Sequence, residues 1–149
     1  MSVIILRGVS GAGKSTYISK REDVNTTIVS ADFFFIDLDT KEYKFDGSKL
    51  PQAHAACLRD FINACDSSGN EQKIYVDNTN TTVAELAPYV AIAAAYGHDC
   101  EIVTVRADTV AAAERNLHGV PLTGVIAQAN RLAAAEKDFA PWWKHTVVE

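Results

Sequence analysis

A chain of 149 residues, 48% hydrophobic and 22% charged, has the composition of one globular domain and not of a disordered protein. Its net charge of −5 argues against a protein that coats nucleic acids non-specifically, because such binding depends on Lys and Arg. The three cysteines form no CxxC pair and the four histidines are scattered, which predicts buried thiols and no zinc site. No run of residues is long and apolar enough to span a membrane and no charged leader opens the chain, so we expect a cytoplasmic protein.

Short apolar segments alternate with helical patterns along the chain, which is typical of a parallel α/β sheet. Near-continuous hydrophobicity within these segments predicts strands that are buried on both faces. A helical stripe over residues 51–65 predicts one of the covering helices. We therefore expect a single domain over residues 1–149. The five predicted strands cover residues 2–7, 26–30, 73–77, 100–105 and 145–149.

The segment 83–97 carries the signals of a helix with defined ends. Thr82 and Glu85 form a capping-box pattern at its start, and Gly97 is placed to end it. Pro88 lies beyond the first turn, so we expect a kink or two short helices. Further along, "PWW" at 141–143 is expected to pack under the last strand, although an interface is the alternative.

Two alanine-rich helices, 109–117 and 122–137, are separated only by the turn "HGVP" at 118–121. With no strand between them, they predict an inserted helical hairpin that works as a lid over roughly 109–137. The lid carries Arg115 and Arg131, while Glu114 and Glu136 are predicted to face solvent. Residues 35–48 show no period and are expected to form a loop with a short turn or hairpin.

"GVSGAGKS", Gly8 to Ser15, matches the phosphate-binding pattern GxxxxGK[ST] and lies between a predicted strand and a predicted helix. Glycines let the backbone wrap so that N–H groups point at phosphate oxygens. Lys14 is expected to bridge the β- and γ-phosphates of ATP, and Ser15 to hold Mg²⁺. The predicted nucleotide-binding residues are Gly8, Ser10, Gly11, Ala12, Gly13, Lys14, Ser15 and Thr16.

Polar residues follow the second and third predicted strands, whose carboxyl ends meet the phosphate loop at one edge of a parallel sheet. Asp32 at this edge is a candidate general base for an attacking hydroxyl, and Asp77 a candidate Mg²⁺ ligand with Ser15. Capping of the next helix is an equal alternative for residues 79–82. "SADFFFID" leaves open whether its phenylalanines are core or acceptor pocket. The candidate acceptor-binding residues are Phe33, Phe35, Asp77, Asn78 and Asn80.

The motifs "GVSGAGKST", "SADFF", "VDNTNTTVAELAPYV" and "ERNLHGVP" together resemble the P-loop polynucleotide 5′-hydroxyl kinases. The likeness is to the kinase module of the DNA-repair kinase/phosphatase and to small stand-alone bacterial and phage kinases. It implies a three-layer P-loop kinase fold with strand order 2-3-1-4-5, ATP and Mg²⁺ as cofactors, and Asp32 as the catalytic base. It also implies catalytic roles for Lys14 and for the lid residues Arg115 and Arg131. Phe35 departs from the family, since several members have a phosphate-gripping arginine there.

The leading interpretation is an ATP-dependent kinase acting on a nucleic-acid hydroxyl, with a polynucleotide 5′-hydroxyl as acceptor. One alternative is a kinase for the hydroxymethyl group of a modified pyrimidine in DNA, whose base the Phe33–Phe35 wall would stack on. Another is a kinase for a nucleoside, sugar or antibiotic. A third, from a different class, is an ATP-binding regulatory module without an acceptor.

Overall fold

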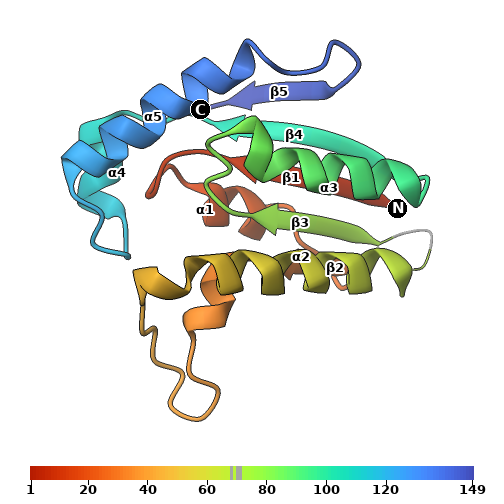
Figure 1. Ribbon diagram of the computed structural model, residues 1–149, viewed down its shortest axis with the longest axis horizontal. Coiled ribbons are helices and arrows are strands. Elements are labelled where there is room, and N and C mark those ends of the chain that lie inside the picture. Colours follow the sequence, from red (N-terminus) through yellow and green to blue (C-terminus); the bar gives the residue numbers. More distant parts are fainter. Residues whose placement is uncertain (68, 70–71) are drawn as a thin grey trace.

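The computed structural model describes residues 1–67, 69 and 72–149, and its centre is a five-stranded parallel sheet (Figure 1). The strand order β2-β3-β1-β4-β5 confirms the predicted order and the α/β class. The predicted strands lie within one residue of the observed ones. These are β1 (Ser2–Arg7), β2 (Thr26–Val29), β3 (Lys73–Asp77), β4 (Asp99–Val105) and β5 (Lys144–Val148).

Helices cover both faces of the sheet, which completes the three layers. Alternation along β1 sends Val3 and Ile5 to the face covered by α2 and α3, and Leu6 to the face covered by α1, α4 and α5. The helices are α1 (Lys14–Ser19), α2 (Leu50–Asp66), α3 (Val83–Ala95), α4 (Thr109–Arg115) and α5 (Leu122–Glu136), with 3-10 turns η1 (Ala31–Phe35) and η2 (Gly47–Lys49).

Helix α3 runs without a break through Pro88, so the prediction of two short helices is wrong. Its buried face, with Leu86 and Tyr89 on either side of the proline, packs into the core and offsets the lost backbone hydrogen bond. The Thr82 hydroxyl caps the helix by accepting from the Glu85 N–H at 3.3 Å, as the sequence predicts. The Glu85 carboxylate accepts instead from the backbone of Thr81, one residue earlier than a capping box requires.

Residues 36–46 form an arm that extends away from the sheet below α2 in Figure 1. An antiparallel bridge joins Ile36 to Tyr43, so the predicted short hairpin is present within the loop. The bridge brings the Tyr43 side chain back toward the carboxyl edge of the sheet, where its hydroxyl contacts Asp32.

A buried arginine at the end of β1 fastens the lid helix α5 to the sheet. Arg7 is 0% exposed and donates to the Leu132 carbonyl oxygen at 2.8 Å and to the Glu136 carboxylate at 3.1 Å. Glu136 also pairs with Arg106 at 3.3 Å, so the prediction that Glu136 faces solvent is wrong. The buried charge accounts for this, since an unpaired guanidinium in the core would lose its solvation without compensation.

The aromatic pair after α5 divides between core and solvent. Trp143 packs against the core and against Phe139, whereas Trp142 is 82% exposed. The expected packing under the last strand therefore holds for Trp143 alone. Across residues 1–67, 69 and 72–149, no helix combines the length and the apolar character needed to cross a bilayer.

Candidate active site

The phosphate loop connects β1 to α1 and is held in place by close backbone packing. Gly11 and Gly13 have φ angles of 81° and 101°, which side chains other than glycine rarely adopt. A Cβ added at Gly11 would lie 2.1 Å from the Ala112 carbonyl oxygen, so the C-terminal half of α4 rests directly on the loop. Gly11 and Gly13 thus allow the curvature of the loop, and Gly11 also leaves room for α4 to pack on it.

Lys14 begins α1 and folds its side chain back over the loop. Its ammonium group donates to the carbonyl oxygens of Gly8 and Val9, each at 3.0 Å. Burial lowers the pKa of Lys14, and the negative charges of Asp77 and Asp32 oppose that shift. The lysine therefore lies where both carboxylates act on its charge.

Ser15 and Asp77 place two oxygen ligands side by side at the carboxyl edge. The Ser15 hydroxyl donates to Asp77 Oδ2 at 3.4 Å. Burial raises the pKa of the Asp77 carboxyl, and the charge of Lys14 partly offsets this. A hydroxyl and a carboxylate beside a phosphate loop are a donor set that suits Mg²⁺, which takes few protein ligands and completes its shell with phosphate and water.

Asp32 lies in the 3-10 turn that follows β2, as the strand-end argument predicts. The Tyr43 hydroxyl donates to Asp32 Oδ1 at 3.2 Å, and His118 Nε2 lies 3.3 Å from Asp32 Oδ2. Burial, with the negative charge of Asp32 and its hydrogen bond, raises the pKa of Tyr43 to about 12, so the phenol remains a donor. Asp32 is thus approached by side chains from the arm and from the lid.

The three phenylalanines after Asp32 do not form one wall. Phe35 is 5% exposed and packs in the core with its ring against Phe34 and Phe45, which corrects the prediction that it binds the acceptor. Ala31 and Phe35, at the two ends of η1, are its buried residues, whereas the side chains between them lie closer to solvent. Phe33 is 48% exposed beside Asp32 and remains available for an acceptor.

The asparagines after β3 form hydrogen bonds that connect the ends of neighbouring strands, and their role in acceptor binding stays a prediction. Asn78 accepts from the Ala31 N–H at 2.9 Å and donates to Cys57 Sγ, which links β3 to the end of β2. Asn80 is 2% exposed and donates to the Leu6 carbonyl oxygen at 2.7 Å, which links the same segment to β1. Both side-chain amides are buried and hydrogen-bonded. The two asparagines therefore hold the carboxyl ends of the neighbouring strands in place, where the candidate site lies.

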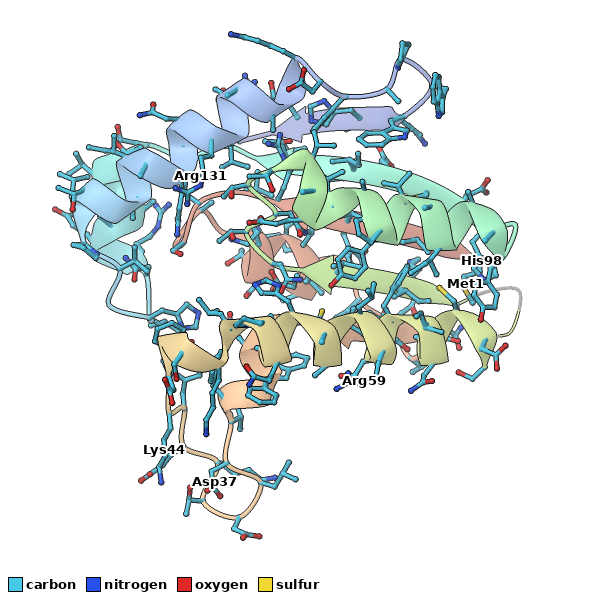
Figure 2. All side chains as sticks on the ribbon, in the orientation of Figure 1. Met1, Asp37, Lys44, Arg59, His98 and Arg131 are labelled. Carbon is cyan, nitrogen blue, oxygen red and sulfur yellow. The ribbon has the colours of Figure 1, made fainter. Side chains whose placement is uncertain are left out.

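Lid side chains contact the phosphate loop from above. Arg115 donates twice to the Gly11 carbonyl oxygen, at 3.2 and 3.0 Å. The Gln128 side chain makes two hydrogen bonds with Ser10. It accepts from the Ser10 N–H at 2.9 Å and donates to the Ser10 hydroxyl at 3.2 Å. Arg131 projects from α5 toward the carboxyl edge (Figure 2), where its Nε donates to the Thr81 hydroxyl at 3.3 Å. Of the two predicted arginines, only Arg115 contacts the loop itself.

A pocket of about 580 Å³ opens on the other side of the phosphate loop, where α1 meets the ends of β4 and β5. Neither Asp32 nor Asp77 lines it. Its walls combine an aromatic ring and several cations, with Arg21 stacked over the Tyr17 ring at 3.7 Å. The residues that line it include Gly13, Thr16, Tyr17, Arg106, Val148 and Glu149.

Reasoning from sequence missed Tyr43, His118, Gln128 and Arg106 as site residues. Arg106 directly follows the fourth predicted strand. The argument that polar residues after the second and third strands meet at the carboxyl edge of the sheet would therefore also have found Arg106. Tyr43 and His118 come from segments that sequence places only as loop and turn. Their approach to Asp32 depends on how the arm and lid fold back, which no local pattern encodes.

Comparison with known proteins agrees with this geometry. The profile of a family described as an AAA domain matches residues 3–118, most of the chain. NEDD4-binding protein 2 of Homo sapiens is 30% identical over 127 residues, which cover 79% of this chain and 7% of that protein. The chain thus spans a small part of this curated relative.

Two solved structures share the fold at low sequence identity. A chain of the Pnkp1/Rnl/Hen1 RNA repair complex superposes with a TM-score of 0.71 and 19% identity, over 93% of this chain and 46% of that one. A gluconokinase from Sinorhizobium meliloti 1021 superposes with a TM-score of 0.59 and 15% identity, over 99% of this chain and 81% of that one. The chain therefore belongs to the AAA domain family, and it shares its fold with these two solved structures.

Proposed function

We propose that this chain transfers the γ-phosphate of ATP to a nucleic-acid hydroxyl, a polynucleotide 5′-hydroxyl, with Asp32 as the general base. One observation carries the proposal. Asp32 lies at the same edge as the phosphate loop, close enough to Lys14 for its negative charge to oppose the lowering of the Lys14 pKa by burial. A carboxylate on the acceptor side can take the proton of an attacking hydroxyl, which a kinase needs, whereas a nucleotide switch has no acceptor hydroxyl to deprotonate.

In this proposal each residue acts on a different part of the transfer. Asp32 accepts the proton of the acceptor hydroxyl as that oxygen attacks phosphorus, and the ADP oxygen leaves on the opposite side. Lys14 and the loop N–H groups bind the β- and γ-phosphates, and Arg115, already seated on the loop, adds positive charge when the lid is closed. Ser15 and Asp77 would hold Mg²⁺, which when bound offsets charge on the phosphate oxygens.

The 580 Å³ pocket is the proposed place of the nucleoside part of ATP. It adjoins Thr16 and Gly13 at the start of α1 and lies away from Asp32. The arrangement puts nucleotide and acceptor on opposite sides of the phosphate loop, so the two substrates do not compete for space. Arg106 at the pocket wall is available to stack on a planar base.

Two observations support a nucleic acid as the acceptor. The solved structure that superposes with a TM-score of 0.71 is part of an RNA repair complex. Beside Asp32, Phe33 is 48% exposed and Phe34 is 42% exposed, and exposed aromatic rings are the usual platform for an unpaired base. The same rings suit the hydroxymethylated pyrimidine of a DNA acceptor, which makes such a duplex a second nucleic-acid substrate to test.

A small-molecule acceptor is the second candidate, and a separate observation favours it. The gluconokinase superposition covers 81% of the other chain, so a domain of similar extent forms that protein. The net charge of −5 also offers little attraction to a long polyanion. Sugars and nucleosides therefore belong in the same set of acceptors.

The test measures transfer of labelled γ-phosphate to 5′-hydroxyl oligonucleotides, to a duplex containing hydroxymethyluracil, and to nucleosides and gluconate. Asp32→Asn keeps the size of the side chain but cannot take a proton, so we expect transfer to fall by about 100-fold or more with ATP affinity unchanged. Asp99→Asn, at the opposite edge of the sheet, is the matched control and keeps full activity.

The outcomes separate the candidates. Label on the oligonucleotides supports the polynucleotide kinase, while label only on the modified duplex or only on a small molecule identifies one of the alternatives. Steady ATP hydrolysis with no labelled acceptor would indicate the regulatory module. Loss of ATP binding in Asp32→Asn would overturn the assignment of Asp32 as base.

A further inference from the structure

His118 occupies a turn that the local sequence holds in one shape. The Asn116 side chain donates to the carbonyl oxygens of Ala113 and Val120, at 2.8 and 2.9 Å, and accepts from the Val120 N–H at 2.9 Å. Gly119 has a φ of 68°, which lets the chain reverse directly after His118. The turn between α4 and α5 is thus fixed on both sides of the histidine.

The turn points His118 at the proposed base. Its Nε2 lies 3.3 Å from Asp32 Oδ2, and its ring packs on Tyr43 with centroids 4.8 Å apart. Tyr43 in turn donates to the other carboxylate oxygen of Asp32 at 3.2 Å. The carboxylate is therefore held at both oxygens, once from the arm and once from the lid.

These contacts orient Asp32 without using up its capacity as a base. An ionised carboxylate has two oxygens with about four acceptor positions, and the two contacts take one on each oxygen. The remaining positions are open to the hydroxyl of an acceptor. With both oxygens held, rotation of the carboxylate away from that hydroxyl is restricted.

The same turn also contacts the phosphate loop. Arg115, three residues before His118, donates twice to the Gly11 carbonyl oxygen, and Gly11 packs on the Ala112 carbonyl of α4. One short segment therefore contacts the ATP-binding loop with one residue and the acceptor-side base with another. If the lid lifts from the loop, His118 leaves Asp32.

We propose that His118 is a positioning residue, which orients Asp32 only while the lid is seated on the phosphate loop. The inference rests on the proposed function, since it assigns a partner to the proposed base. The His118 and Asp32 side chains are 38% and 47% exposed, and a polar contact at such an exposed site contributes little to folding stability. The contact acts on geometry, where small displacements of a reacting group cost large factors in rate.

The test compares His118→Leu with His118→Gln in the full 149-residue chain, using whichever acceptor the wild type phosphorylates. Leucine cannot donate to Asp32, so kcat is expected to fall by about ten- to a hundredfold while KM for ATP stays within about twofold. Glutamine places an amide donor near the position of Nε2, and we expect it to restore most of kcat. His98→Gln, at the far end of the sheet in Figure 2, is the control and keeps wild-type kcat.

A second measurement detects the contact between His118 and Asp32 independently of catalysis. In ¹⁵N NMR spectra of the histidine rings, Asp32→Asn is expected to shift the His118 signals and to leave those of His98 in place. Thermal unfolding of each variant confirms that the chain is folded. A shift of His118 together with the kcat pattern above supports the proposal.

Failure of the inference and failure of the proposed function look different. If the wild type phosphorylates an acceptor and His118→Leu has the same kcat, His118 is not a positioning residue and Asp32 can still be the base. His118→Gln as slow as His118→Leu would also overturn the positioning role, because the hydrogen-bond donor is then not what matters. If the wild type phosphorylates no acceptor, the proposed function is wrong and the inference falls with it.

Discussion

At the scale of single residues, the site sets two carboxylates in different surroundings. Asp77 is partly buried at the strand ends and this burial raises the pKa of its carboxyl, whereas Asp32 remains half exposed after the edge strand β2. A buried carboxylate suits a metal, because the ion supplies the charge that water no longer does. An accessible carboxylate suits proton transfer from an incoming hydroxyl. Their environments therefore match the separate roles assigned to them.

Asp77 leads to a prediction about pH. Because the pKa of its carboxyl is raised on folding, the unfolded chain ionises first, and the free energy of unfolding without ligand falls as pH rises from about 4 through the folded pKa. Mg²⁺ binds the ionised form, so its apparent affinity with ATP rises over the same window and binding releases protons. Calorimetry in buffers of different ionisation enthalpy measures that release.

Asp77→Asn provides the comparison. The variant has no proton to lose at this position, so Mg²⁺ affinity is expected to be weak and nearly independent of pH in that window. An unchanged pH dependence in Asp77→Asn would show that another group titrates with the metal, and the assignment of Asp77 as ligand would then fail.

At the scale of elements, the contacts of α4 with the body differ in character from those of the C-terminal half of α5. The α5 end is fixed by the buried Arg7, while α4 rests on the phosphate loop through Gly11 and Arg115. A buried charge network opens only at high cost, and contacts of an exposed arginine open easily. We therefore expect lid motion to pivot near the C-terminal half of α5, with α4 and the His118 turn moving most.

The first element-scale prediction concerns Arg7. Arg7→Met removes the donors that satisfy Glu136 and the Leu132 carbonyl oxygen, so unfolding is expected to become easier by about 3–5 kcal/mol. Arg59→Met, on the exposed side of α2 in Figure 2, is the matched control and is expected to change stability by less than about 0.5 kcal/mol. Urea denaturation measures both.

A double variant makes the Arg7 prediction sharper. Glu136→Leu added to Arg7→Met removes the carboxylate that was left without its buried partner, and part of the loss is expected to return. Equal stability of Arg7→Met and Arg59→Met would mean that the buried arginine does not anchor α5.

The second element-scale prediction concerns the seating of α4. Gly11→Ala adds a Cβ 2.1 Å from the Ala112 carbonyl oxygen and forces loop and helix apart, so ATP affinity is expected to fall by about tenfold or more. Gly97→Ala is the control, because Gly97 has a similar φ of 72° but open space around its Cβ position. It is expected to lose about 1–2 kcal/mol of stability with ATP affinity unchanged. Fluorescence titration with a labelled ATP analogue distinguishes the two.

At the scale of the whole molecule, nucleotide binding and folding are linked. Binding to the folded chain alone adds about 2.7 kcal/mol at a hundred times Kd, which raises the Tm of a domain of this size by about 5–10 °C. We expect this shift with MgATP in differential scanning fluorimetry and a much smaller one in Lys14→Met. A Tm that does not respond to MgATP in the wild type would contradict the nucleotide site.

Sequence predicted the parts that local pattern encodes. The β-branched run of β1, followed by "GVSGAGKS", predicted the strand, the phosphate loop and the helix. The position of Asp32 and Asp77 after strands of a parallel sheet predicted that both lie at its carboxyl edge. Prediction from sequence failed where partners are distant or a turn decides direction. Arg7 pairs with Glu136, 129 residues away, and η1 sends Phe35 inward and leaves Phe33 outside. The hydrogen bond of the Asn80 side chain is likewise made to a distant partner, the Leu6 carbonyl oxygen of β1.

The pocket proposed for the nucleoside has one wall that belongs to Val148 and Glu149. The N-terminus, in contrast, lies at the opposite end of the strands (Figure 1). A purification tag joined at Glu149 therefore starts beside the lining of that pocket, whereas a tag joined at Met1 starts at the other end of the strands. We expect the first to weaken the binding of ATP more than the second.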